Sequence, residues 1–212
     1  MSAPQTPEPV LLLQLPGVRW SASDAQRSRQ GLADVEVDIL TAVSQDETWV
    51  YVPATGARGR EMFEDPTVLL TEMLPDGAGE RFEYRIRRLL RLHTIGDPVA
   101  GPQQRWHYTS QTDVPVETDD EFNRWFDEEH LPGLAAVPGT VRASRYRTDG
   151  SPRYLAGYDL SRAEVQGGGA WSAAVSTPWR DRIHREFVGP RRLMFERLLD
   201  DRGTGGSGGS GA

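Results

Sequence analysis

The sequence predicts an α+β fold, because one order of elements, β-α-β-β-α-β, occurs twice along its 212 residues. In the second half, an amphipathic helix at 118–130 follows one strand and precedes two strands joined by the turn signal Asp149–Gly150. The first half repeats this order with different residues. The repeated unit is the ferredoxin-like arrangement, whose sheet has one apolar face that helices leave uncovered. We therefore expect two ferredoxin-like repeats, packed face to face, to form one α+β barrel.

The first repeat is expected to occupy residues 10–97. A run of apolar residues, a polar helix pattern and two further apolar runs follow one another in it, and Pro66 interrupts its second helical region. We expect strands at 10–15, 34–43, 48–52 and 81–93, and helices at 21–32 and 58–74.

The second repeat is expected to occupy residues 98–202. Gly167–Gly169 and Pro178 should interrupt its last helical region. We expect strands at 105–113, 140–148, 153–160 and 191–199, and helical regions at 118–130 and 161–187.

Both ends of the chain differ in composition from the rest. Residues 1–9 are rich in proline and are expected to be disordered. Residues 203–212 form a Gly/Ser tract that is expected to be a flexible tail. Neither segment enters the fold prediction.

Composition excludes several classes of function. There is no Cys and no Lys, so thiolate metal sites, thiol nucleophiles, Schiff-base lysines and the P-loop lysine are excluded. A net charge of −7 argues against a nucleic-acid partner. No apolar run is long enough to cross a membrane, and no signal peptide is recognisable. We expect a cytoplasmic protein, monomer or homodimer, that binds a small molecule and no metal.

The stretch at 118–139 carries the clearest functional signal. Thr118 and Glu121 have the spacing of a capping box, and Pro132 should end the helix close to His130. Trp125 and Phe126 lie on its aromatic face. His130 would then stand at a helix end beside an apolar face. An imidazole there can transfer protons near neutral pH, with Asp127 or Glu129 to orient it; alternatively, it only interacts with the helix dipole.

These residues resemble the dimeric α+β barrel superfamily, and within it the EthD-like group. The resemblance covers about 105–199 and rests on an aromatic residue, an acidic pair, a His followed by Pro, and a Pro-Gly turn into a strand. Here these are Trp125, Glu128–Glu129, His130–Pro132 and Pro138–Gly139. The superfamily includes cofactor-free isomerases, polyketide cyclases and monooxygenases, together with haem proteins and barrels of no known activity. The resemblance therefore implies the fold more specifically than the reaction.

Strand alternation supplies further candidate residues. His107 and Arg105 share one face of a strand, and Trp106 and Tyr108 share the other. On the neighbouring predicted strands, one face carries polar residues that either meet solvent or line a cavity. The candidates for substrate binding or oxyanion stabilisation from these other strands are Arg85, His93, Tyr146 and Tyr158.

The residues favour a cofactor-independent enzyme that moves protons on a small apolar or aromatic metabolite, as a cyclase, isomerase or lyase of bacterial secondary metabolism. His130 would be the general acid or base, with Tyr146 and His107 as further catalytic candidates. A cofactor-free monooxygenase, a haem enzyme that uses His184 as ligand, and a non-catalytic ligand-binding barrel are the alternatives.

Overall fold

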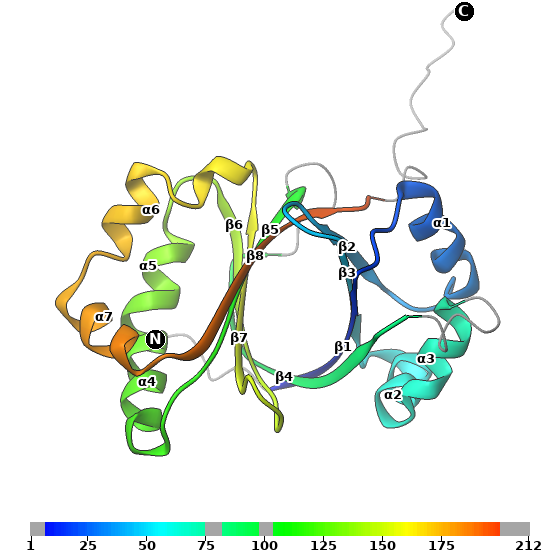
Figure 1. Ribbon diagram of the computed structural model, residues 1–212, viewed down its shortest axis with the longest axis horizontal. Coiled ribbons are helices and arrows are strands. Elements are labelled where there is room, and N and C mark those ends of the chain that lie inside the picture. Colours follow the sequence, from blue (N-terminus) through cyan, green and yellow to red (C-terminus); the bar gives the residue numbers. More distant parts are fainter. Residues whose placement is uncertain (1–6, 75–81, 98–103, 200–212) are drawn as a thin grey trace, which may run out of the picture.

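The computed structural model describes residues 7–74, 82–97 and 104–199. Eight antiparallel strands close into one barrel, and helices cover it on two opposite sides (Figure 1). Helices of the first half lie on one side, and helices of the second half lie on the other. The predicted α+β barrel is confirmed.

The strands follow one order in each half. Around the barrel the order is β4-β1-β3-β2 and then β8-β5-β7-β6, which closes back on β4. The contacts between halves are the ladders β2–β8 and β4–β6. The strands are β1 (Glu8–Pro16), β2 (Asp38–Ala42), β3 (Glu47–Pro53), β4 (Arg85–Ile95), β5 (Trp106–Asp113), β6 (Thr140–Arg147), β7 (Tyr154–Leu160) and β8 (Val188–Arg197).

The helical layers differ in their construction. The first-half layer consists of α1 (Ala22–Gly31), α2 (Gly56–Glu64) and α3 (Pro66–Met73). The second-half layer contains α4 (Asp119–Trp125), a π-helical turn (Phe126–His130), α5 (Leu131–Ala135), α6 (Gly169–Ala174) and α7 (Pro178–Ile183), with 3₁₀ turns at Val116–Thr118, Ala163–Val165 and His184–Glu186. As expected, breaks separate α2 from α3 and α6 from α7. None of the described helices is long and apolar enough to span a membrane.

Alternation along the strands divides the core into three parts. Outward-facing residues of β1 and β3, such as Leu13 and Val50, pack beneath α1–α3. Outward-facing residues of β5 and β7, such as Tyr108 and Tyr158, pack beneath α4–α7. Inward-facing residues form a third cluster around Trp49 and fill much of the barrel, as expected for eight strands.

Two local predictions are wrong. The helix does not stop at His130: the π turn adds a residue, the Leu131 N–H bonds the Phe126 carbonyl, and the helix runs on through α5. Pro132 then falls in the first turn of α5, where its missing N–H costs little. The capping box is also absent, because the Thr118 hydroxyl donates to the Pro115 carbonyl at 3.1 Å.

The predicted segments at the ends can be compared only in part. Glu8 and Pro9, placed in the disordered N-terminal segment, belong to β1. Residues 1–6, the Gly/Ser tail and the link between the repeats at 98–103 lie outside the described residues.

Candidate functional site

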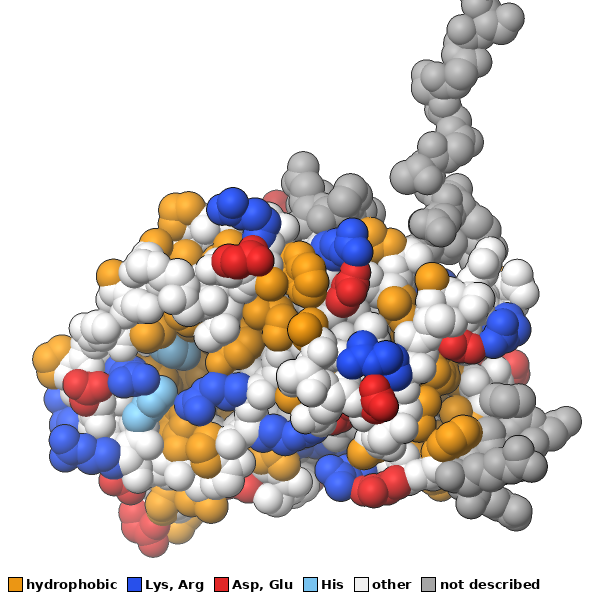
Figure 2. Space-filling model, turned by 45° about the horizontal axis from the view of Figure 1, so that its top comes forward, with side chains coloured by type: hydrophobic (Ala, Val, Ile, Leu, Met, Phe, Trp, Pro, Cys, Tyr) orange, Lys and Arg blue, Asp and Glu red, His pale blue; other side chains and the backbone are white. Residues whose placement is uncertain are grey.

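A cavity of about 420 Å³ lies between the outer face of the second-half sheet and helices α4–α7. Figure 2 shows histidine, arginine and hydrophobic side chains gathered around a hollow on this half of the molecule. Its size falls in the range of small-molecule sites. Aromatic walls, two imidazoles and three guanidinium groups distinguish the lining, which includes Tyr108, Phe122, Phe126, His130, Arg145, Tyr154, Tyr158, Trp171, Arg180, His184, Phe187 and Arg192.

His130 reaches this cavity from the end of the π turn. Its ring stacks on Trp125 with centroids 4.3 Å apart and meets the edge of Phe126 at 4.9 Å. Burial lowers the pKa of His130 to about 3, helped by the nearby positive charges of His184, Arg180 and Arg145. His130 is therefore a neutral imidazole at pH 7, held by aromatic packing.

Neither predicted orienter contacts His130 through a hydrogen bond among the described residues. Asp127 pairs with Arg145 at 2.8 Å instead. Glu129 accepts hydrogen bonds from Trp125 Nε1 at 3.0 Å and from the Thr177 hydroxyl. The structure therefore does not form the expected carboxylate–imidazole pair, because Asp127 is paired with Arg145 and Glu129 with Trp125 and Thr177. Glu129 instead fixes the indole on which the imidazole stacks.

Arg145 is the buried cation of the site. Its side chain is 2 % exposed, and its guanidinium lies 4.7 Å from the Phe126 ring and 5.3 Å from the Tyr154 ring. It donates to Asp127 and to the side chain of Asn123, both on the same helical run. Strand β6 and this helix therefore hold the positive charge at a fixed place beside the cavity.

Three buried donors in the cavity lining have no hydrogen-bond partner among the described residues: the Tyr158 hydroxyl, Arg145 Nε and Arg180 Nε. Burial raises the pKa of Tyr158 far above its usual value, so the phenol keeps its proton. The described lining contains no Asp or Glu. The described lining is thus rich in donors and positive charge, and the carboxylates that pair with two of its arginines, Asp127 with Arg145 and Asp181 with Arg180, are not part of the lining.

His184, the candidate haem ligand, lies in the same wall just after α7. Its ring packs on Phe187 with centroids 4.4 Å apart and meets the Trp125 ring at 6.0 Å. Burial lowers its pKa to about 4, and Arg180 and Arg192 contribute. The cavity therefore holds two neutral imidazoles at pH 7. In the described part of the chain, no three His, Asp or Glu residues are grouped to bind a metal ion.

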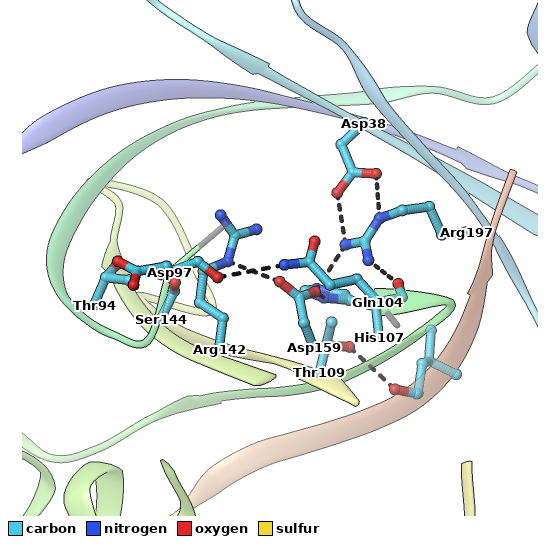
Figure 3. Close-up of polar contacts among 11 residues, drawn as sticks. Asp38, Thr94, Asp97, Gln104, His107, Thr109, Arg142, Ser144, Asp159 and Arg197 are labelled. Atoms are coloured by element: carbon cyan, nitrogen blue, oxygen red, sulfur yellow. Dashed lines mark hydrogen bonds and ion pairs between the residues drawn. The ribbon is translucent and has the colours of Figure 1, made fainter. Parts of the chain in front are cut away.

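His107 and Tyr146 face the barrel interior instead. His107 Nδ1 donates to Asp159 at 2.7 Å, and Arg142 and Arg197 contact the same carboxylate (Figure 3). Burial acts to raise the pKa of Asp159, but the His107 hydrogen bond and the two arginines outweigh it and lower the pKa well below normal. His107 Nε2 lies against Gly157, where an added Cβ would come within 3.0 Å of it. This network is tightly packed and shares no residue with the lining of the cavity beneath α4–α7, so a catalytic role for His107 stays a prediction.

The remaining candidates are divided between several places. The cavity lining contains Phe126, Tyr108 and Tyr158 together with His130. Trp125 does not line the cavity but stacks on the His130 ring. Trp106 packs at the edge of the same core without lining the cavity. Arg85 lies at one barrel mouth. His93 stands 3.9 Å from Asp127, because a β-bulge after Arg91 turns it to the outer face.

Sequence reasoning missed several residues of this site. Arg145 lines the cavity from β6, whereas its neighbour Tyr146 faces the barrel interior, and no motif in the sequence marks the Arg145 face as functional. Arg180, Arg192 and Trp171 lie on three different elements, and no local spacing connects them. The one available signal was the parity of Tyr154, Ala156 and Tyr158, which share the cavity face of β7.

The sequence matches no protein-family model and no curated protein. Solved structures of similar fold include an anthrone oxidase-like protein, with a TM-score of 0.60 and 14% identity over 91% of this chain and 92% of that chain. A ferredoxin-fold protein from Listeria monocytogenes, related to antibiotic biosynthesis monooxygenases, has a TM-score of 0.55 and 12% identity over 90% of this chain and 95% of that chain. A heme-degrading enzyme from Listeria monocytogenes has a TM-score of 0.54 and 11% identity over 89% of this chain and 98% of that chain. These likenesses show the ferredoxin-like α+β barrel; the EthD-like assignment stays a prediction.

Proposed function

We propose that the chain is an enzyme that binds a small aromatic phenol or enol in the cavity beneath α4–α7 and removes a proton from it. The observation that carries this proposal is the set of unpartnered donors, Tyr158 Oη, Arg145 Nε and Arg180 Nε, in a lining without carboxylates. Buried donors of this kind fit a developing negative charge on oxygen. The aromatic walls fit the apolar body of such a substrate.

His130 is the proposed proton acceptor. Its imidazole is neutral at pH 7, and no described residue hydrogen-bonds to its ring nitrogens, so a lone pair is available. In the proposed step, a substrate O–H or C–H bond breaks, its electron pair stays on the substrate, and the proton moves to the imidazole. The new anion beside the imidazolium then stabilises it, which offsets the lowering of the His130 pKa by burial and by the neighbouring positive charges. A cyclase, isomerase or lyase could use this anion directly.

Two alternatives use the same cavity. A cofactor-free monooxygenase would let the substrate anion react with O₂, and the names of the anthrone oxidase-like and monooxygenase-related neighbours favour it. A haem enzyme would use His184, whose neutral imidazole is the form that binds iron. Substrate-dependent O₂ uptake would support the first, and a Soret band upon addition of haemin would support the second.

Histidine side-chain NMR tests the proposal before a substrate is known. Uniformly ¹⁵N-histidine-labelled protein is titrated with a panel of hydroxylated naphthoquinones and anthraquinones, and His130→Gln assigns the signal. Saturable shifts of the His130 resonance, with His107 unmoved, are expected. Shifts of His107 alone, or no shift with any compound, would contradict the proposal.

A further inference from the structure

A second cavity lies at the barrel mouth where the β6–β7 hairpin turns. It has a volume of about 570 Å³ and shares no lining residue with the cavity beneath α4–α7. Its described lining contains Gln14, Arg85, Ile86, Arg87, Arg88, Gln111, Thr148, Asp149, Gly150, Ser151, Pro152, Gly189 and Arg191. The lining is rich in hydrogen-bond donors.

One hydrogen bond across the barrel sets the orientation of a buried amide. Arg87 on β4 donates to Gln111 Oε1 on β5 at 2.6 Å, although these strands are not neighbours in the sheet. Because the guanidinium requires an acceptor, the oxygen of Gln111 must face it and Nε2 must point away. That Nε2 is buried and has no hydrogen-bond partner within the described part of the chain, and the same holds for Nε2 of Gln14. The two residues are only 2 % and 3 % exposed.

Charge at this mouth is unbalanced among the described residues. Arg85 pairs with Glu83 at 2.6 Å, and Arg191 pairs with Glu47. Arg87 and Arg88 donate only to neutral oxygens, those of Gln111 and Pro152 and those of Phe63 and Glu64. Asp149 is the one acidic residue in the described lining. Among the described residues, neither guanidinium forms an ion pair with a carboxylate, although Asp113 interacts electrostatically with Arg87 and Asp65 with Arg88.

We propose that this mouth binds a small organic anion through a carboxylate or phosphate group. The anion accepts hydrogen bonds from Nε2 of Gln14 and Gln111, and the Arg87 charge stabilises it. Hydrogen bonds from neutral amides to an ionised oxygen belong to the stronger class of such bonds. The proposal is independent of the chemistry at His130, because it rests on a different cavity.

Calorimetric titration of the full chain with citrate and with inorganic phosphate, at constant ionic strength set with chloride, tests it. Gln111→Glu keeps an oxygen for Arg87 but replaces the free donor with a negative acceptor. Gln26→Glu, on the exposed face of α1, adds the same charge elsewhere. We expect one saturable site for at least one anion, weakened roughly tenfold or more by Gln111→Glu and unchanged by Gln26→Glu.

The anion that binds more tightly identifies the group the site takes. Absence of saturable binding by both anions would overturn the proposal, as would equal affinity in the wild type and Gln111→Glu. Should Gln111→Glu fail to fold, Gln14→Glu removes the other free donor and must weaken binding by a similar factor.

Discussion

The two halves of the barrel share one strand order but fill the space beneath their helices differently. Strand β1 presents Leu11, Leu13 and Leu15 to α1–α3. Strand β5 holds the equivalent place in the second half and presents Tyr108, Ser110 and Thr112 to the cavity. The small polar side chains of Ser110 and Thr112 thus leave room at positions where β1 carries leucines.

The helices follow the same division. Helices α2 and α3 contribute Met62 and Leu69 to a closed apolar layer. The second-half layer contributes the imidazole of His130 and the guanidinium of Arg180 to a cavity wall. The same strand order thus supports two helical layers that differ both in their helices and in the side chains they place on the sheet, and the cavity lies under the layer with the more polar side chains.

Separate expression of the two halves tests whether each half needs the other in order to fold, and it should have the largest effect on the protein. Residues 1–97 and 98–202, expressed separately, should each fail to form a stable monomer, because separation breaks the β2–β8 and β4–β6 ladders and exposes the Trp49 cluster to water. Circular dichroism and analytical ultracentrifugation measure this. Two stable, monomeric, well-dispersed domains would contradict the single barrel.

Catalysis should depend on one imidazole of the second-half layer. His130→Gln should lower turnover by roughly 10²–10⁴, the usual contribution of a positioned general acid–base. The fold should persist, since an amide can occupy this partly buried place, and the melting temperature serves as the control. Asp127→Asn should cost less, because Asp127 acts on Arg145 rather than on the imidazole. Unchanged turnover in His130→Gln would refute the assignment.

Substitutions in the barrel interior should change the stability of the protein rather than its activity. Asp159→Asn leaves Arg142 and Arg197 without a shared, buried carboxylate, and should lower the free energy of unfolding by about 3–5 kcal/mol. Asp46→Asn removes an exposed pair with Arg19 and should cost under about 1 kcal/mol. Urea denaturation compares the two. Equal costs would mean that the Asp159 network contributes little.

A larger side chain in the cavity beneath α4–α7 should make the second-half layer resemble the closed first-half layer. Ser110→Leu places a larger side chain where β1 carries leucine, and should weaken binding of a quinone found by NMR at least about tenfold, since the ligand would lose its space. Wild-type affinity in a folded Ser110→Leu variant would move the binding site elsewhere.

Much of the fold was predictable because it rests on local patterns. The apolar run in β1, the interruption at Pro66 and the Asp149–Gly150 turn each predict structure from neighbouring residues. The errors arose where a single extra residue changed the geometry. The π turn carried the helix past His130, and the bulge after Arg91 moved His93 to the outer face.

The site was less predictable, because its contacts join distant segments. Asp127 meets Arg145 across 18 residues, and the Thr177 hydroxyl meets Glu129 across 48. Four of the twelve proposed site residues, His130, Phe126, Tyr108 and Tyr158, line the cavity, which shows that strand parity and one aromatic helix face are informative. The unpartnered donors depend on packing that no spacing reveals.

The last prediction concerns stability at acid pH and compares the two histidines of the second-half layer, His130 and His184. His130 has a pKa of about 3 in the folded chain against 6.5 for a free side chain, so between these values the unfolded chain binds more protons. Stability should therefore rise with pH in this window and be lost progressively as pH falls from about 6.5 toward 3. His130→Gln removes this linkage, whereas His184→Gln removes a weaker one, because the pKa of His184 is lowered only to about 4. Urea denaturation at about pH 7 and about pH 4.5 measures the loss, and carboxylates contribute equally to all three proteins. The wild type should lose the most stability and His130→Gln the least. An identical loss in all three proteins would show that the His130 imidazole is already solvated in the folded chain, and that water has free access to the cavity beneath α4–α7.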